Sequence, residues 1–174
     1  MLRGGYGVSM LFALGFVLAT PTESQAQASF QGLGPMVAAT GVSANGSVIV
    51  GEGFEGGVSG LFIWTAGTGS INAPRPAGFH TTLVSGVSAD GNFVSGTLIT
   101  GFLPNQRNEG FRWSRARGYE RIGVGSSPFP SSQASAISGD GSALVGGVSA
   151  DASGRRLPIR WSETTGIVEL SPLP

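Results

Sequence analysis

The sequence predicts an all-β fold of three antiparallel four-stranded repeats, arranged as a propeller-like partial or open β-propeller. A cassette occurs three times, with the first halves GVSANGSVIVG, GVSADGNFVSG and AISGDGSALVG and the second halves LFIWTAGTG, GFRWSRARG and PIRWSETTG. The repeats cover residues 37–76, 83–125 and 133–171, and a period of about 40–50 residues is typical of a four-stranded propeller blade. Glycine contributes 30 of the 174 residues and helical periodicity is absent after the first segment, which favours strands and turns.

Four strands can be placed in each repeat. The first is rich in small residues, which suits the innermost strand of a radial stack, and it ends before an Asx-Gly pair whose glycines are Gly46, Gly91 and Gly141. We predict a two-residue type I′ turn at each pair, because that turn needs positive φ at both positions. The second strand has apolar residues on both faces, as in a sheet covered on both sides. The third strand carries the structural anchors Trp64, Trp113 and Trp161, which we interpret as packing residues rather than a sugar-binding platform.

The first 28 residues have the pattern of a signal peptide. Arg3 precedes an apolar run at residues 8–19 that is too short to span a bilayer, and an Ala-Gln-Ala cleavage motif ends at Ala28. We therefore expect export to the extracellular space, the cell surface or the periplasm, with no retained transmembrane segment and a single β-repeat domain over 29–174.

The two ends of this domain predict open strand edges. Residues 30–34 resemble a fourth strand that has no blade in front of it, so we expect an orphan outer strand there. Three repeats are fewer than the usual number of blades, and exposed edges invite association. The sequence therefore leaves two alternatives open, a homo-oligomer and a longer repeat array.

No catalytic or metal-binding signature stands out. Cysteine is absent and the formal net charge is zero, so we predict no thiolate site and no nucleic-acid partner. We also predict no cofactor and no metal site, because each Asx-Gly turn offers at most one carboxylate. His80, the only histidine, lies in a linker without a supporting triad motif. A secreted glycan-active hydrolase remains an alternative, which two carboxylates about 5–10 Å apart in a cleft would favour.

Arginines are the best candidate binding residues. They gather in the second and third repeats, at Arg107, Arg112, Arg115 and Arg117, and at Arg155, Arg156 and Arg160. A guanidinium group fits carboxylates and phosphates, so these residues predict a surface glycan as partner. Another protein is the alternative partner, and the competing interpretation of the arginines is a solvated outer face of ordinary strands.

The cassette V-S-x-D/N-G-x-x-x-x-G followed by F-R-W resembles the HAF-type bacterial extracellular repeats, and Phe111-Arg112-Trp113 is its closest match. Such repeats occur in PEP-CTERM-type exported proteins and in autotransporter passenger regions. The resemblance implies export and a propeller-like β-repeat fold, and it supplies no catalytic residues. We expect an exported non-enzymatic module that acts as a structural, adhesive or ligand-binding scaffold. The N-terminal fragment of an autotransporter-like passenger is a further alternative.

Overall fold

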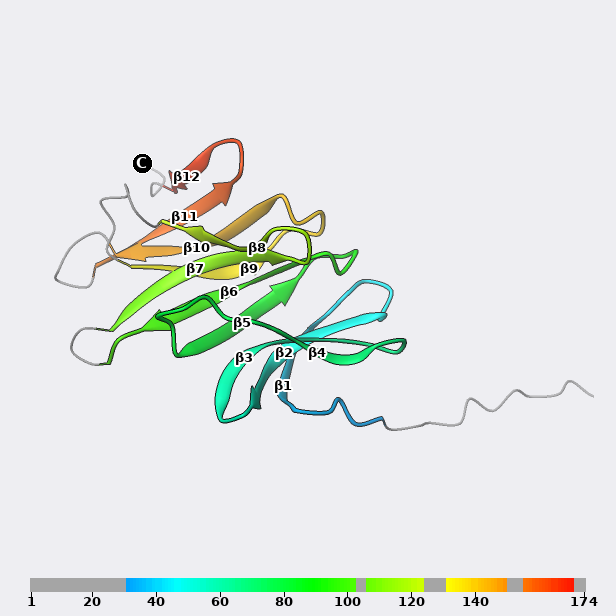
Figure 1. Cartoon of the computed structure of the whole chain (residues 1–174). Coiled ribbons are helices and arrows are strands. Elements are labelled where there is room, and N and C mark those ends of the chain that lie inside the picture. Colours follow the sequence, from blue (N-terminus) through cyan, green and yellow to red (C-terminus); the bar gives the residue numbers. More distant parts are fainter. Residues whose placement is uncertain (1–30, 103–105, 124–130, 150–154, 171–174) are drawn as a thin grey trace, which may run out of the picture. The chain divides into compact units, whose positions relative to one another are not determined.

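The computed structural model describes residues 31–102, 106–123, 131–149 and 155–170, which hold twelve strands and no helix. Figure 1 shows them as three sheets in chain order. Sheet 1 holds β1 (Met36–Val42), β2 (Val48–Glu55), β3 (Val58–Thr65) and β4 (Gly69–Ala73); sheet 2 holds β5 (Thr81–Val87), β6 (Phe93–Thr100), β7 (Arg107–Ser114) and β8 (Gly118–Ile122); sheet 3 holds β9 (Ser132–Ile137), β10 (Ala143–Ser149), β11 (Arg156–Ser162) and β12 (Gly166–Glu169).

Each repeat forms one antiparallel four-stranded sheet whose strands pair in chain order. The predicted all-β architecture is confirmed, and the three sheets do not close on themselves. The predicted signal peptide lies outside the described residues. Among the residues described, no helix could span a lipid bilayer.

The orphan strand expected at residues 30–34 is wrong over its described part. Residues 31–33 belong to no strand and residues 34–35 form a turn. This segment instead lies along sheet 1, where Ser70 Oγ donates to the Leu33 carbonyl and Phe54 N–H donates to the Pro35 carbonyl at 3.4 Å. It contributes single backbone contacts, and β4 remains the outer strand of sheet 1.

The Asx-Gly pairs form hairpin turns, but not of type I′. Gly46, Gly91 and Gly141 have φ of 73°, 79° and 73°, whereas no described non-glycine residue has positive φ. In each turn the Asx side chain accepts a hydrogen bond from the serine hydroxyl two residues earlier and from the backbone N–H two residues later. These local bonds hold the Asx residue at negative φ and leave the left-handed conformation to glycine alone.

A β-bulge occurs at the same place in every inner strand. Its extra residue carries a hydroxyl group each time, at Thr40, Ser85 and Ser135. Opposite the bulge lies the glycine that closes the cassette, where the two backbones approach closely. A Cβ added to Gly51 or to Gly146 would lie 1.9 Å from a carbonyl oxygen of the inner strand. The closing glycine is therefore required by the bulge.

The core lies between the sheets. We call the face of a sheet toward the following repeat its forward face, and the opposite face its backward face. The forward face of sheet 1 packs on the backward face of sheet 2 through Val50, Leu61, Ile63, Ala73, Val84, Val94, Leu98 and Phe111. The forward face of sheet 2 meets the backward face of sheet 3 through Ile122, Ala134, Leu144, Val148 and Ile159. Sheet 2 is thus covered on both faces, as its apolar pattern predicts.

The inner strands touch each other and need small side chains. A Cβ on Gly41 of β1 would lie 3.4 Å from the Gly86 Cα of β5, and Ser85 Oγ donates to the Ala134 carbonyl of β9 at 2.6 Å. The small residues of the first strand therefore mark the crowded contact between neighbouring repeats.

Candidate functional site: the junction of the second and third repeats

Arg112 is the centre of the junction. It is the middle residue of the Phe-Arg-Trp tripeptide on β7, so strand alternation places it on the forward face of sheet 2. Its side chain is buried, with 3% of its surface exposed. The guanidinium carbon lies 5.0 Å from the ring centre of Phe93 in its own sheet and 5.0 Å from that of Trp161 in sheet 3. Arg112 is therefore held between two aromatic rings from adjacent repeats.

Four hydrogen bonds satisfy the Arg112 guanidinium. Nε donates to Glu120 Oε2 at 2.9 Å and Nη2 donates to Glu120 Oε1 at 3.2 Å. Nη2 also donates to Glu163 Oε2 at 3.0 Å, and Nη1 donates to the Gly141 carbonyl at 3.1 Å. Glu120 lies on β8, directly opposite in register, whereas Glu163 and Gly141 belong to the third repeat. One side chain thus joins the two sheets.

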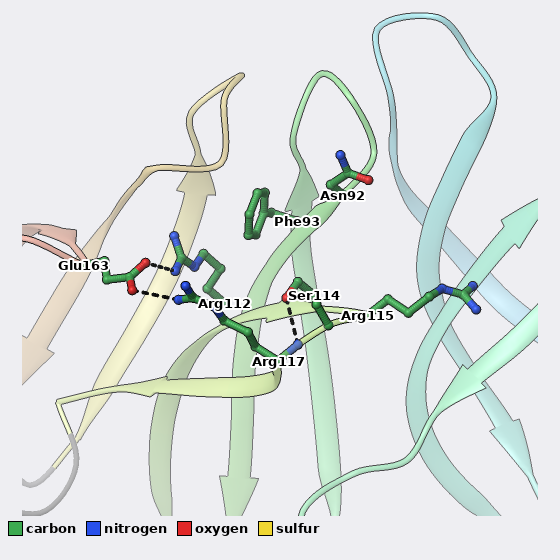
Figure 2. A pocket seen from close by; sticks show the side chains of 8 residues that line it. Asn92, Phe93, Arg112, Ser114, Arg115, Arg117 and Glu163 are labelled. Atoms are coloured by element: carbon green, nitrogen blue, oxygen red, sulfur yellow. Dashed lines mark hydrogen bonds and ion pairs between the residues drawn. The ribbon is translucent and has the colours of Figure 1, made fainter.

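Arg117 completes a four-charge network above Arg112. Its Nη1 donates to Glu120 Oε1 at 3.0 Å and to Glu163 Oε1 at 2.7 Å. Figure 2 shows Arg112 and Arg117 side by side, both bonded to the carboxylate of Glu163. Two guanidinium groups face two carboxylates, so the network as a whole is neutral.

The network keeps all four groups charged. Burial would raise the pKa of Glu120, but hydrogen bonds and charge from Arg112 and Arg117 outweigh burial and lower it. The pKa of Glu163 is lowered by its hydrogen bonds to Arg117 and Arg112. Burial acts to lower the pKa of Arg112, and the two carboxylates overcome it and raise the pKa.

Two pockets flank this network. The first, of about 340 Å³, has Arg112 and Ser114 on its wall with Asn92, Phe93, Arg115 and Glu163 around it. The second, of about 330 Å³, is lined by Arg160, Ser162 and Thr164 and shares Arg112 and Glu163 with the first. The ion network therefore forms a common wall between two recesses.

The predicted arginines do not gather on one face. Arg107 begins β7 while Arg115 and Arg117 follow its end, so a distance of about 20–25 Å separates them at roughly 3.3 Å per strand residue. In Figure 2 the Arg115 side chain points away from the pair of Arg112 and Glu163. The interpretation as a solvated face is wrong for Arg112, because the third repeat covers it.

The arginines of the third repeat are separated in the same way. Arg155 and Arg156 lie at the start of β11, where Arg156 donates to the side-chain oxygen of Gln133. Arg160 is exposed on the forward face of sheet 3. It occupies the position that Arg112 has in the second repeat and Ile63 in the first.

The tryptophans lie on the backward faces. Trp113 packs against the core between sheets 1 and 2, and Trp161 packs against the core between sheets 2 and 3. Trp64, their equivalent in the first repeat, is half-buried. The turn glycines also contact neighbours, since a Cβ on Gly91 would lie 2.5 Å from Val48 and one on Gly141 would lie 2.2 Å from Phe93.

Other candidate groups are held by local structure. His80 bonds to the Gly101 carbonyl and stacks on Phe102 with ring centres 4.6 Å apart. Ser88 is fully buried and donates to Asp90 within its turn. Among the described residues no group of three or more His, Cys, Asp or Glu side chains could hold a metal ion.

Glu120 and Glu163 form the carboxylate pair that the sequence could not place. Both accept hydrogen bonds from Arg112, and Glu163 borders both pockets. A glycosidase needs one carboxyl group with a raised pKa to act as acid, whereas both of these pKa values are lowered. The spacing of Arg112 and Glu120 across a tight hairpin could have indicated their pairing. Nothing in the local sequence points to Glu163.

Comparison with known proteins identifies the architecture. No family model matches the chain, and no curated protein matches it. TolB from Acinetobacter baumannii is similar in structure, with a TM-score of 0.55 at 13% identity over 79% of this chain and 33% of that protein. A putative TolB from Agrobacterium tumefaciens gives 0.52 at 13% identity over 79% and 50% of the two chains.

The tricorn protease gives a TM-score of 0.51 at 14% identity over 72% of this chain and 13% of that one. The chain thus spans half or less of the length of each of these structures. At such low identity the likeness shows the fold alone. The three sheets are therefore consecutive blades of a partial β-propeller.

Proposed function

We propose that this chain is an exported, non-catalytic binding scaffold whose ligand site is the pocket beside Arg115 and Phe93. The likeness to propeller structures supports the scaffold. The pattern of residues 1–28 supports export, and the cassette supports membership of the HAF-type extracellular repeats.

The pocket at the junction carries the proposal. Its lining includes the half-buried Phe93, Asn92 and the exposed Arg115. In Figure 2 the Arg115 side chain extends away from Arg112 and Glu163, so these residues do not hold it. Arg115 has no ion pair with any described residue, whereas Arg112 and Arg117 are neutralised by Glu120 and Glu163. Arg115 is therefore the cation of this pocket that is available to a ligand.

A carboxylated or phosphorylated surface glycan fits these groups. Guanidinium binds carboxylate and phosphate oxygens through paired N–H donors, and an aromatic ring provides an apolar surface for a sugar. The neutral network beneath the pocket keeps its wall rigid without competing for an anion.

Isothermal titration calorimetry with oligogalacturonate, and with maltooligosaccharide as the uncharged comparison, tests this function. Arg115→Gln should weaken oligogalacturonate binding about tenfold, the loss expected for one charge-assisted hydrogen bond. Arg107→Gln is the matched control, because Arg107 is exposed at the other end of β7.

Equal binding of the two glycans, or equal affinity of Arg115→Gln and the unaltered protein, would reject the site. Release of reducing sugar from either glycan by the unaltered protein would instead support the hydrolase alternative. Loss of that release in Glu163→Gln would assign the reaction to the carboxylate pair.

A further inference from the structure

We propose that copies of this chain associate head-to-tail, with the forward face of sheet 3 docked on the backward face of sheet 1 of a second copy. This inference rests on contacts between repeats and not on glycan binding. Three of the contacts that join two repeats within the chain have one of their halves repeated at each end of the stack.

The first such contact is a hydrogen bond between turns. Ala44 N–H donates to the Ala89 carbonyl at 2.9 Å, and Ala89 N–H donates to the Gly139 carbonyl at 2.7 Å. The next donor in this series is Gly139 N–H and the first acceptor is the Ala44 carbonyl. Neither has the corresponding backbone partner among the described residues. A second copy would continue the series from Gly139 to Ala44.

The second contact is apolar and joins the inner strands. A Cβ on Gly41 would lie 3.3 Å from Val87, and one on Gly86 would lie 3.8 Å from Ile137. Val42 is the equivalent of Val87 and Ile137, and it is 60% exposed. The corresponding position on the other side is Ala136, at the forward face of sheet 3. Val42 of one copy would therefore pack on Ala136 of the next.

The third contact involves the tryptophans. Ile63 belongs to the cluster against which Trp113 packs, and the Arg112 guanidinium lies 5.0 Å from the ring centre of Trp161. The remaining pair in this series is Arg160 and Trp64. Arg160 is exposed and Trp64 is half-buried, so both are available to form a cation–π contact between copies.

The forward face of sheet 3 also exposes apolar surface that its equivalents bury. Val50 and Ser95 occupy the position of Val145 in the first two repeats and are fully buried, whereas Val145 is 45% exposed. Val168 and Leu170 on the same face are 44% and 45% exposed. Such a face is typical of an interaction surface. The backward face of sheet 1 presents the matching halves of the three contacts at Ala44, Val42 and Trp64, beside Phe62, which the chain itself already buries.

The contact is heterologous, because two different surfaces meet. Repetition of such a contact produces a closed ring if the rotation closes and a filament if it does not. In either case, blocking one face of a chain leaves its other face able to bind one partner. That property separates this arrangement from a symmetric dimer.

The experiment uses Val145→Glu, which blocks sheet 3, and Val42→Glu, which blocks sheet 1. Burying a carboxylate in an apolar interface is costly, and both valines are exposed enough for the fold to tolerate the change. Phe54→Glu is the control, because Phe54 is 57% exposed but lies on neither face of the proposed contact. Circular dichroism checks that each variant is folded, and Leu170→Glu replaces Val145→Glu if that variant is not.

Sedimentation velocity is measured over a wide range of protein concentration. The unaltered protein and Phe54→Glu should associate, whereas Val145→Glu and Val42→Glu should each be monomeric. A mixture of the two blocked variants should form a one-to-one complex that grows no further.

A monomeric unaltered protein would overturn the proposal. So would association that persists in both variants, or a mixture that remains monomeric. Because Arg115 lies outside both faces, failure of glycan binding would leave these outcomes unchanged.

Discussion

Arg112→Ile places in the second repeat the residue that the first repeat has at the equivalent position, Ile63. In the first repeat Ile63 pairs in register with Ile71, and in the second Arg112 pairs with Glu120. The chain thus contains two solutions for one position, an apolar pair and an ion pair. The double variant Arg112→Ile/Glu120→Ile copies the first solution into the second repeat.

The size of the effect follows from the bonds that are removed. Arg112→Ile deletes four hydrogen bonds and leaves the Gly141 carbonyl without its donor. Breaking a buried ion pair costs about 3–5 kcal/mol, but Glu120 keeps its bond to Arg117. We therefore expect the free energy of unfolding to fall by about 2–3 kcal/mol.

The double variant should recover most of that loss. Replacement of a buried ion pair by apolar residues of similar volume is often neutral or stabilising. We expect the double variant to lie within about 1 kcal/mol of the unaltered protein, with a coupling of at least about 1–2 kcal/mol between the sites. Urea unfolding of the four proteins measures this cycle. An unchanged stability of Arg112→Ile, or a double variant less stable than Arg112→Ile, would refute the reasoning.

Acid sensitivity provides a second readout of the same network. The pKa of Glu120 and of Glu163 is lowered in the folded protein from the model-peptide value of 4.5. Their stabilisation is therefore complete above that value and is lost as the pH falls through the lower folded pKa. The double variant should lose less stability than the unaltered protein as the pH falls below about 4.5.

Three further predictions concern the repeat itself and its surfaces. Gly146→Ala should destabilise the fold by at least about 1–3 kcal/mol in urea unfolding, because the new Cβ would lie 1.9 Å from the Gln133 carbonyl oxygen; Gly67→Ala, which meets nothing within 4 Å, should leave stability nearly unchanged. Asp90→Asn with Asp140→Asn should keep the turns at neutral pH, as asparagine does in the first repeat. It should also reduce the loss of stability between about pH 4 and pH 2, because the Ser138 hydroxyl bond lowers the pKa of Asp140 to about 2. An unchanged loss of stability on acidification would contradict this. Salt should weaken oligogalacturonate binding, since one exposed guanidinium carries it, and salt-independent affinity would argue against Arg115.

The position of each hairpin could be predicted from the sequence, but the type of its turn could not. An Asx-Gly pair predicts a tight turn, and the structure has one at all three places. The predicted type I′ conformation was wrong, because the serine two residues before each Asx residue donates a hydrogen bond from its hydroxyl group to the Asx side chain. That bond changes the backbone conformation of the Asx residue without changing the position of the hairpin.

At the junction of the second and third repeats, the face on which Arg112 lies could be predicted, but its burial could not. Period-two alternation predicts that Arg112 and Trp113 lie on opposite faces of sheet 2. The structure confirms this, because Trp113 packs against the core shared with sheet 1 and Arg112 lies beside Trp161 of sheet 3. Alternation cannot say whether a face meets solvent or another sheet. The third repeat decides this, since Glu163 and Gly141 approach Arg112 only after the two sheets pack.

The sequence by itself determined the strand order, the repeat boundaries and the residues that share each face, because these depend on local periodicity and turn chemistry. The tertiary structure decided which faces are buried, which arginines are neutralised and why the cassette closes on glycine. These features depend on contacts between residues about 20–50 positions apart, whose approach no local pattern encodes. The same packing also distinguishes Arg112, sealed between two repeats, from Arg160, which occupies the same position and remains exposed.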